Sequence, residues 1–368
     1  VEKDKFSDDY AVVSCDWGKE ATPVEVFQFN GAHEQVSRSV LNLADEAHFD
    51  YIDIVGLQVV KDKGVYVCTN SYNLRGDNKE QVVNSATYIS KLAPGSTAFQ
   101  STKIDLQPRT REIKGMLEYN PRLGQIELLT QALENKDYPH NKISLHRKFW
   151  TDLTFIHPQS LSIINQKRIE TNTLTEYKRE ASNDKAAING FPQDMLIDDD
   201  GIKRTIILED VAETVRRNQG PGFAYANITY KGMGILEFDS SMALTNTLFA
   251  DKNITTGDMD IFFNLNRRAK GYAKCAQRNI LFNIGYVDNL SFDYIPGVQN
   301  KYVVFNDRGD KLSSPFKTMY AKLNGGSRAE YLFGPDSDQK VLTASAVYDK
   351  TKNTYSALVE EGEGRRLV

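Results

Sequence analysis

Cysteine, tryptophan and histidine are scarce in this chain, which holds 3, 2 and 5 of them among 368 residues. The three cysteines, Cys15, Cys68 and Cys275, lie far apart in the sequence and form no CxxC element. This spacing argues against thiolate zinc sites and thioredoxin chemistry. Because the number is odd, two interpretations stay open: one disulfide with a spare thiol, or three reduced buried thiols.

An excess of positive charge and long apolar runs are also missing. The chain has 45 basic and 49 acidic side chains and a net charge of −4, so it lacks the basic excess of a nucleic-acid-binding protein. No stretch approaches the roughly 18 uninterrupted apolar residues of a transmembrane helix. We therefore expect neither a nucleic-acid partner nor a transmembrane segment.

The sequence signatures of common catalytic and metal sites are missing as well. There is no GxSxG, Walker loop or GxGxxG pattern. The pair His33-Glu34 is not a zincin element, because Ser37 stands where the second histidine would be. Asp198–Gly201 is acidic but does not have the spacing of an EF-hand. The sequence therefore predicts no catalytic, cofactor-binding or metal-binding residue and favours a protein that is not an enzyme.

The informative part of the composition is aromatic. The 18 Tyr and 18 Phe fall mostly in short alternating or β-branched runs bounded by Gly, Asn, Asp and Pro, a pattern typical of strands. The predicted strands and hairpins are Tyr10–Cys15, Tyr51–Val60 with Val65–Cys68, Met195–Ile197 with Thr205–Leu208, Lys301–Phe305, and Ala344–Tyr348 with Thr354–Val359. One helix is predicted over Glu34–His48 from the spacing of Val36, Val40 and Leu43. Residues 74–94 and 216–232 are predicted to be surface loops.

A strand-end motif recurs along the chain. The segment Gly115-Met-Leu-Glu-Tyr-Asn120 recurs as Gly234-Ile-Leu-Glu-Phe-Asp239. The shorter pattern of an aromatic followed by Asn or Asp occurs at Phe29-Asn30, Tyr119-Asn120, Phe238-Asp239, Phe305-Asn306 and Tyr348-Asp349, with Ile156-His157 as a degenerate copy. We expect the Asn or Asp to end its strand by bonding back to its own turn.

The spacing of these copies predicts the fold. Several intervals are near one or two units of about 40–50 residues, the length of a four-stranded propeller blade. We therefore predict an all-β fold, a single β-propeller-like domain over residues 1–368 with about seven blades and minor helical insertions. Another all-β architecture and a two-domain α+β chain are the alternatives.

Part of the chain resembles a known group of proteins. Residues 115–368 are similar to exported β-propeller-like proteins of the Bacteroidota. The motifs that carry the resemblance are Gly115–Pro121, Asp194–Gly201, Gly220–Gly222 and Lys301–Asn306. The resemblance implies a blade architecture and export to the periplasm or cell surface, and it supplies no catalytic residue. The first 110 residues match it poorly.

Two functional hypotheses follow. The first is a non-enzymatic exported scaffold that binds a protein partner, as a subunit of an outer-membrane transport or secretion assembly. The second is a polysaccharide-binding protein, or a polysaccharide lyase or glycosidase. For a glycan or partner contact, the candidate residues are His146, Arg147, Trp150, His157, Arg267 and Arg268. Histidine and arginine together could neutralise a uronate and abstract its α-proton, whereas a solvated basic surface is the alternative interpretation.

Overall fold

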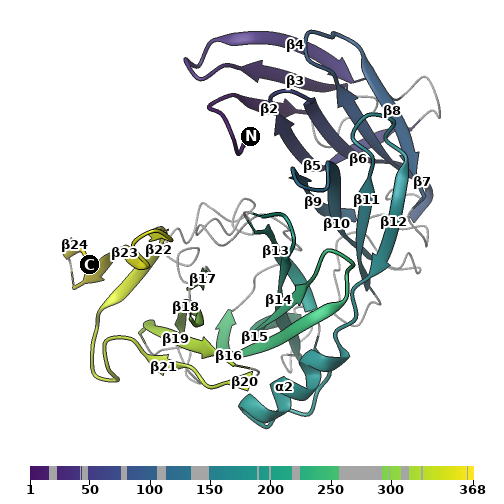
Figure 1. Cartoon of the computed structure of the whole chain (residues 1–368). Helices are drawn as coiled ribbons and strands as arrows, with labels where there is room; N and C mark the ends of the chain where they lie inside the picture. The colour runs from purple at the N-terminus through teal and green to yellow at the C-terminus, as the bar shows by residue number, and fades with distance from the viewer. Residues whose placement is uncertain are drawn as a thin grey trace. The chain divides into compact units, whose positions relative to one another are not determined.

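The computed structural model divides the chain into two compact units, Val1–Ile169 and Glu170–Val368, which are described here one at a time (Figure 1). The described residues are 1–15, 23–41, 43, 49–75, 81–105, 113–133, 149–188, 190–198, 200–217, 224–256, 292–297, 299–307, 315–324, 326–362 and 364–368.

The first unit contains three four-stranded antiparallel sheets, each with its strands hydrogen bonded in chain order. Sheet 1 consists of β1 (Glu2–Lys3), β2 (Tyr10–Ser14), β3 (Val24–Phe29) and β4 (Gln35–Leu41). Sheet 2 consists of β5 (Tyr51–Val60), β6 (Gly64–Arg75), β7 (Gln81–Leu92) and β8 (Phe99–Ile104). Sheet 3 consists of β9 (Ile113–Asn120), β10 (Gln125–Leu133), β11 (Phe149–Ile156) and β12 (Ile163–Arg168).

The second unit contains helix α2 (Asn172–Ser182) and three further sheets. Sheet 4 consists of β13 (Gly190–Ile197), β14 (Arg204–Arg217), β15 (Ala224–Phe238) and β16 (Leu244–Thr256), with β20 (Gly326–Ser327) parallel to β16. Sheet 5 consists of β17 (Phe292–Pro296), β18 (Lys301–Asp307), β19 (Lys317–Leu323) and β21 (Glu330–Tyr331). Sheet 6 consists of β22 (Lys340–Asp349), β23 (Thr354–Glu361) and β24 (Gly364–Leu367).

The predicted fold class is confirmed. Most of the described residues are in strands, and their repeating unit is the four-stranded antiparallel meander of a propeller blade. They form six sheets, against the predicted number of about seven blades. That residues 1–368 make a single domain stays a prediction.

Neighbouring sheets of the first unit share cores. One buried cluster joins sheet 2 to sheet 3 and includes Tyr66, Ile89, Leu117 and Ile126. Two smaller clusters join sheet 1 to sheet 2. Between β5 and β9 the backbones approach closely because of Gly115, where an added Cβ would lie 2.6 Å from a methyl carbon of Val55.

The Asn and Asp strand ends form the predicted turns at four positions, Asn30, Asn120, Asp239 and Asp349. At each, the side-chain Oδ1 accepts a hydrogen bond from a backbone N–H two to four residues further along the chain. Asn306 has a different role, since it lies inside β18 and is fully buried. Its Nδ2 donates to the Val341 carbonyl at 2.9 Å, and its Oδ1 accepts from the Thr318 hydroxyl at 2.7 Å. Asn306 therefore ties sheet 5 to sheet 6.

The helix predicted over Glu34–His48 is wrong, because Gln35–Leu41 is strand β4. Val36 and Val40, which suggested the helical stripe, are 60% and 47% exposed. The buried side chains of this strand are Ser39 and Leu41, two residues apart, which is the period of a strand. Most of the remainder of the predicted helix lies outside the described residues.

The predicted loops at 74–94 and 216–232 are also wrong for their described residues, apart from Ala93 and Pro94, which follow the end of β7. Residues Gln81–Leu92 form β7, a central strand that buries Thr87, Ser90 and Lys91 and so appears polar in the sequence. Strand β15 begins at Ala224. Within it, an added Cβ on Gly232 would lie 2.2 Å from the Phe249 ring, so this glycine makes room for packing and does not mark a turn.

Candidate functional site

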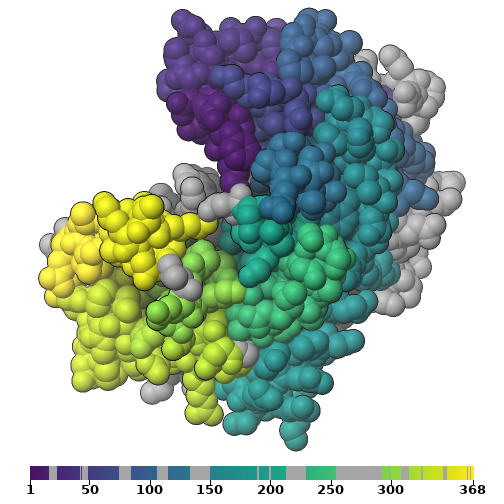
Figure 2. Space-filling model, in the orientation of Figure 1, coloured from purple at the N-terminus to yellow at the C-terminus, as the bar shows by residue number. Residues whose placement is uncertain are grey.

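Sheet 1 has one face in the core and one face at the surface. Ala11, Val24, Val26 and Leu41 point inward and are at most 2% exposed. Cross-strand pairing places Tyr10 beside Phe29 and Val12 beside Phe27 on the opposite face. On the same face, β4 adds Val40, which pairs with Glu25. In the space-filling view the strands of sheet 1, in purple, lie at the molecular surface (Figure 2).

The aromatic side chains of this face contact one another. The rings of Tyr10 and Phe29 stack with centroids 4.8 Å apart and planes 6° apart. The His33 ring lies 5.7 Å from Tyr10, and its Nδ1 is 3.3 Å from the Tyr10 hydroxyl. The Arg38 guanidinium lies 5.7 Å from the centre of the Phe27 ring. We call Tyr10, Val12, Phe27, Phe29, His33, Val36, Arg38 and Val40 the exposed face of sheet 1.

The outer strand of this sheet presents an open edge. β4 is the last strand in the sheet order and pairs only with β3 among the described residues. Its one charged side chain, Arg38, is held against β3 by an ion pair with Glu25 and by the Phe27 ring. Edge strands usually carry charges that discourage further pairing. In the edge strand of sheet 3, β12, two of six residues are charged, Lys167 and Arg168. β4 thus leaves one backbone edge unpaired among the described residues, and its pairing with β3 is irregular between Gln28 and Phe29.

The structure separates the two described members of the predicted glycan set. Trp150 lies near the start of β11, where the Arg168 guanidinium is 5.6 Å from its ring and is paired with Asp152 at 2.9 Å. His157 follows the other end of β11. At about 3.3 Å per residue, the seven steps along the chain from Trp150 to His157 span about 23 Å. Trp150 and His157 therefore cannot contact one sugar ring together.

His157 has a local role in the β11–β12 turn. Its Nδ1 accepts hydrogen bonds from the backbone N–H groups of Gln159 and Ser160 at 3.3 and 3.2 Å. It thereby occupies the place that Asn or Asp takes at the other strand ends. The remaining predicted residues, His146, Arg147, Arg267 and Arg268, lie outside the described residues.

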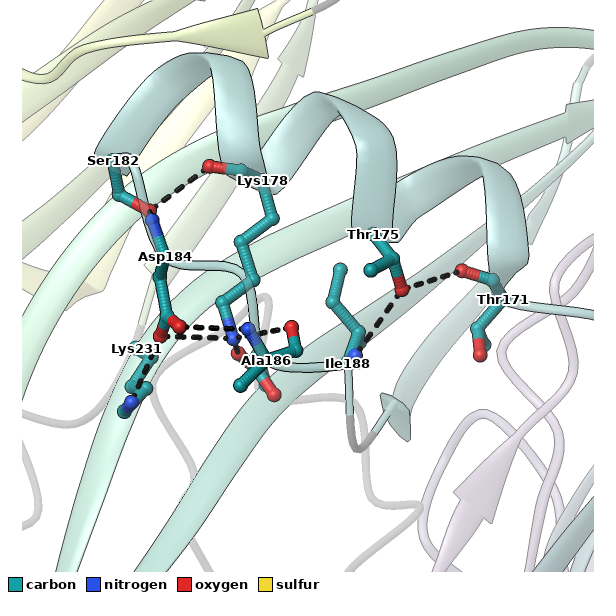
Figure 3. A network of polar contacts seen from close by, with 9 residues as sticks. Thr171, Thr175, Lys178, Ser182, Asp184, Ala186, Ile188 and Lys231 are labelled. Carbon is teal, nitrogen blue, oxygen red and sulfur yellow. Dashed lines mark hydrogen bonds and ion pairs between the residues drawn. The ribbon is translucent and has the colours of Figure 1, made fainter.

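The second unit contains a buried network of charged groups beside helix α2 (Figure 3). The Lys178 Nζ lies 2.7 Å from Asp210 and 3.1 Å from Asp184, and Asp184 also pairs with Lys231 at 2.8 Å. Two cations thus face two carboxylates. Because these groups are partly or fully buried, removing one of them would leave its partners with uncompensated charge. Burial alone would raise the pKa of Asp184, but the hydrogen bonds from Lys231, the Ala186 N–H and Lys178 outweigh it and hold that pKa well below its usual range.

A second buried ion pair lies in the same sheet. Lys252 and Glu209 are both fully buried, with the Nζ 2.7 Å from Oε1. The Lys252 ammonium also lies over the rings of Tyr230 and Phe305, 5.6 and 5.8 Å from their centres. Burial lowers the pKa of Lys252, and the negative charge of Asp307 opposes that shift. Neither side chain has exposed surface, so we assign this ion pair a structural role inside sheet 4.

Metal-type clusters and membrane-spanning helices are not found in the described part of the chain. No group of three or more His, Cys, Asp or Glu side chains there could hold a metal ion. No helix among the described residues is both long and apolar enough to cross a membrane.

The exposed face of sheet 1 was missed at the level of sequence. The helix predicted over Glu34–His48 placed Val36 and Val40 on a buried stripe, whereas both are exposed on a strand. The alternation of Val24 and Val26 with Phe27 and Phe29 is the signal that could have revealed a sheet with two apolar faces.

Comparisons with known proteins give no family. No family model and no curated protein matches the chain. Among solved structures, it is similar to the β-propeller domain of the Trilobed protease from Pyrococcus furiosus, with a TM-score of 0.29 and 10% identity over 100% of this chain and 92% of that one. It is also similar to Pyrococcus horikoshii acylaminoacyl peptidase, with a TM-score of 0.28 and 10% identity over 98% of this chain and 48% of that one. A tail fiber of Staphylococcus aureus phage P68 has a TM-score of 0.23 and 11% identity, over 87% of this chain and 72% of that one. These TM-scores are too low to support an argument, so the fold described above rests on the strands of this chain alone.

Proposed function

We propose that this chain is a non-enzymatic binding protein whose sheet 1 binds a protein partner. The observation that carries the proposal is the exposed face of sheet 1, where Val36 and Val40 are 60% and 47% exposed on the same sheet as the half-buried rings of Tyr10, Phe27 and Phe29. Contiguous apolar surface of this kind marks interaction sites. The opposite face of the same sheet already fills a core, so the sheet does not need this apolar surface for its own packing.

The open edge of β4 favours a protein over a glycan as the occupant. An extended protein segment can hydrogen bond to the backbone of an edge strand and place alternate side chains on its face. A sugar cannot continue the ladder. A second copy of this chain, paired antiparallel about the centre of β4, would bring Arg38 opposite Arg38, which like charges disfavour. We therefore expect a different protein, which adds an extended segment beside Gln35–Leu41.

Site-specific photo-crosslinking tests this proposal. The protein is prepared with a photoreactive side chain in place of Val40 and is mixed with an extract of its own organism. Illumination should give one cross-linked adduct of defined mass. The matched control is a photoreactive side chain at Ile164, which is 54% exposed on the edge strand β12. Mass spectrometry then identifies the cross-linked segment of the partner. A synthetic peptide with that sequence should bind to the Val36→Lys variant and to the Val40→Lys variant at least tenfold more weakly than to the wild-type chain. Equal adducts at both positions, or a chain that only dimerises through β4, would refute the proposal.

The proposal also includes a cellular location for the chain. We place the chain in the periplasm or at the cell surface, as the resemblance of residues 115–368 suggests, and we propose that its partner belongs to an outer-membrane transport or secretion assembly. Fractionation of native cells with an antibody against the chain tests this. Recovery of the chain in the cytoplasmic fraction would contradict it.

A further inference from the structure

Two lysines of the first unit come from neighbouring segments of sheet 2. Lys63 lies in the turn between β5 and β6, and Lys91 lies near the end of β7. The turn is drawn against β7 by Gly64, which has φ of 108° and on which a Cβ would lie 2.0 Å from the Leu92 carbonyl oxygen. Only glycine fits such a position. Burial lowers the pKa of Lys91, and the positive charge of Lys63 lowers it further.

Each ammonium lies over a tyrosine ring. The Lys63 Nζ is 5.5 Å from the centre of the Tyr119 ring, and the Lys91 Nζ is 5.6 Å from that of Tyr66, its cross-strand neighbour. Tyr66 is fully buried and Tyr119 is 8% exposed. These rings stabilise the cations in part, but neither lysine forms an ion pair with a carboxylate among the described residues.

The neighbouring β11–β12 turn brings neutral polar groups to the same place. The Tyr66 hydroxyl donates to the Pro158 carbonyl at 3.0 Å, and the Lys91 Nζ donates to the Gln159 Oε1 at 2.6 Å. Gln159 is exposed, whereas Lys91 is only 5% exposed. The same turn exposes the His157 ring and the hydroxyls of Ser160 and Ser162, which are 2.8 Å apart.

We propose that Lys63 and Lys91 form a binding site for the oxyanion group of an acidic glycan, either a carboxylate or a sulfate. Burying a cation is costly unless an opposite charge accompanies it, and among the described residues no carboxylate forms an ion pair with the buried Lys91 or with the half-buried Lys63. Charge-assisted hydrogen bonds from the ammonium groups to a carboxylate or sulfate would supply the missing pairing. The hydroxyls and amide of the β11–β12 turn match the neutral hydroxyls of a sugar. This site is separate from the exposed face of sheet 1 and does not rest on it.

Titration calorimetry at low ionic strength tests the site. The probes are a trigalacturonate, a sulfated disaccharide, sodium sulfate alone and neutral maltotriose. The acidic sugars should bind saturably and maltotriose should not. Lys63→Gln and Lys91→Gln should each weaken binding of the acidic sugars at least tenfold. The control is Lys103→Gln, which removes one exposed positive charge from β8 of the same sheet, and it should change the affinity less than twofold.

Three results would overturn the proposal. One is that no acidic probe binds the wild-type chain saturably. Another is that Lys103→Gln weakens binding as much as Lys63→Gln, since the attraction would then be general and not local. The third is that sodium sulfate binds as tightly as the acidic sugars, which would replace the glycan by an inorganic ion. Lys91 is buried, so its variant is used only if its circular dichroism matches wild type, whereas the half-buried Lys63 in its turn decides the outcome in either case.

Discussion

Removing one partner of the buried pair between Lys252 and Glu209 should strongly destabilise the second unit. Both side chains have no exposed surface, and their charged atoms lie 2.7 Å apart. Lys252→Met removes the cation and leaves the Glu209 carboxylate buried without it. Breaking a buried pair in this way costs about 3–5 kcal/mol. The loss of the ammonium contacts with Tyr230 and Phe305 acts in the same direction.

The second substitution should restore most of that loss. In Lys252→Met with Glu209→Leu, apolar groups replace both charges, and exchanges of this kind are often neutral or stabilising. We therefore expect the double variant to lie within about 2 kcal/mol of wild type. In a unit of this size each kcal/mol shifts the melting temperature by about 2–4 °C, so the single variant should melt roughly 6–20 °C lower.

Calorimetry is the appropriate assay, because both tryptophans, Trp17 and Trp150, belong to the first unit and their fluorescence does not report on the second. The matched control is Lys352→Met, which breaks an exposed pair with Asp349 at 3.6 Å and should change stability by less than about 1 kcal/mol. If Lys252→Met costs as little as Lys352→Met, the pair is not buried as described and the reasoning fails. A double variant no more stable than Lys252→Met would also contradict it.

Two further predictions concern packing and pH. Gly115→Ala should cost about 1–3 kcal/mol in urea unfolding of the first unit, because its Cβ would lie 2.6 Å from Val55, whereas Gly364→Ala, with no atom closer than 3.5 Å, should be nearly neutral. Asp184→Asn should cost about 1.5–3 kcal/mol at pH 7. Because the pKa of Asp184 is lowered in the folded state, its contribution is present above the unfolded pKa and is lost as pH falls through the folded one. The urea midpoint of wild type should therefore fall more steeply below about pH 4 than that of Asp184→Asn, and parallel curves would contradict the assignment.

The hairpins could be predicted because their information is local. Strands β5 and β6 follow from alternating residues on either side of a tight glycine turn. The Asn and Asp strand ends follow from side chains that reach backbone only two to four residues away. His157 stands at the same place after a strand as these Asn and Asp residues. Its Nδ1 accepts the backbone hydrogen bonds that an Asn or Asp side-chain oxygen accepts at the other strand ends. Asn306 is the exception, because its partners Thr318 and Val341 come from other strands.

The secondary-structure predictions failed in two segments, one where polar residues are buried and one where apolar residues are exposed. β7 is central in sheet 2 and buries Thr87, Ser90 and Lys91, so its polar sequence predicted a loop. β4 exposes Val36 and Val40, so its apolar spacing predicted a buried helical stripe. In each case the neighbouring strands decided exposure, and the sequence of the segment alone does not contain that information.

The two binding sites proposed here depend on contacts of very different range, and this explains why the sequence pointed to neither. The exposed face of sheet 1 needs only β2, β3 and β4, which lie between Tyr10 and Leu41, and a correct strand assignment for Gln35–Leu41 would have revealed it. The lysine site needs sheet 2 to meet sheet 3, through a bond from Tyr66 to Pro158 across 92 residues of chain. Lys63 and Lys91 have no unusual spacing in the sequence. The β5–β6 turn and β7 of sheet 2 supply the two lysines, and the β11–β12 turn of sheet 3 supplies Pro158 and Gln159 beside them, so such a site becomes visible only after the sheets have been placed.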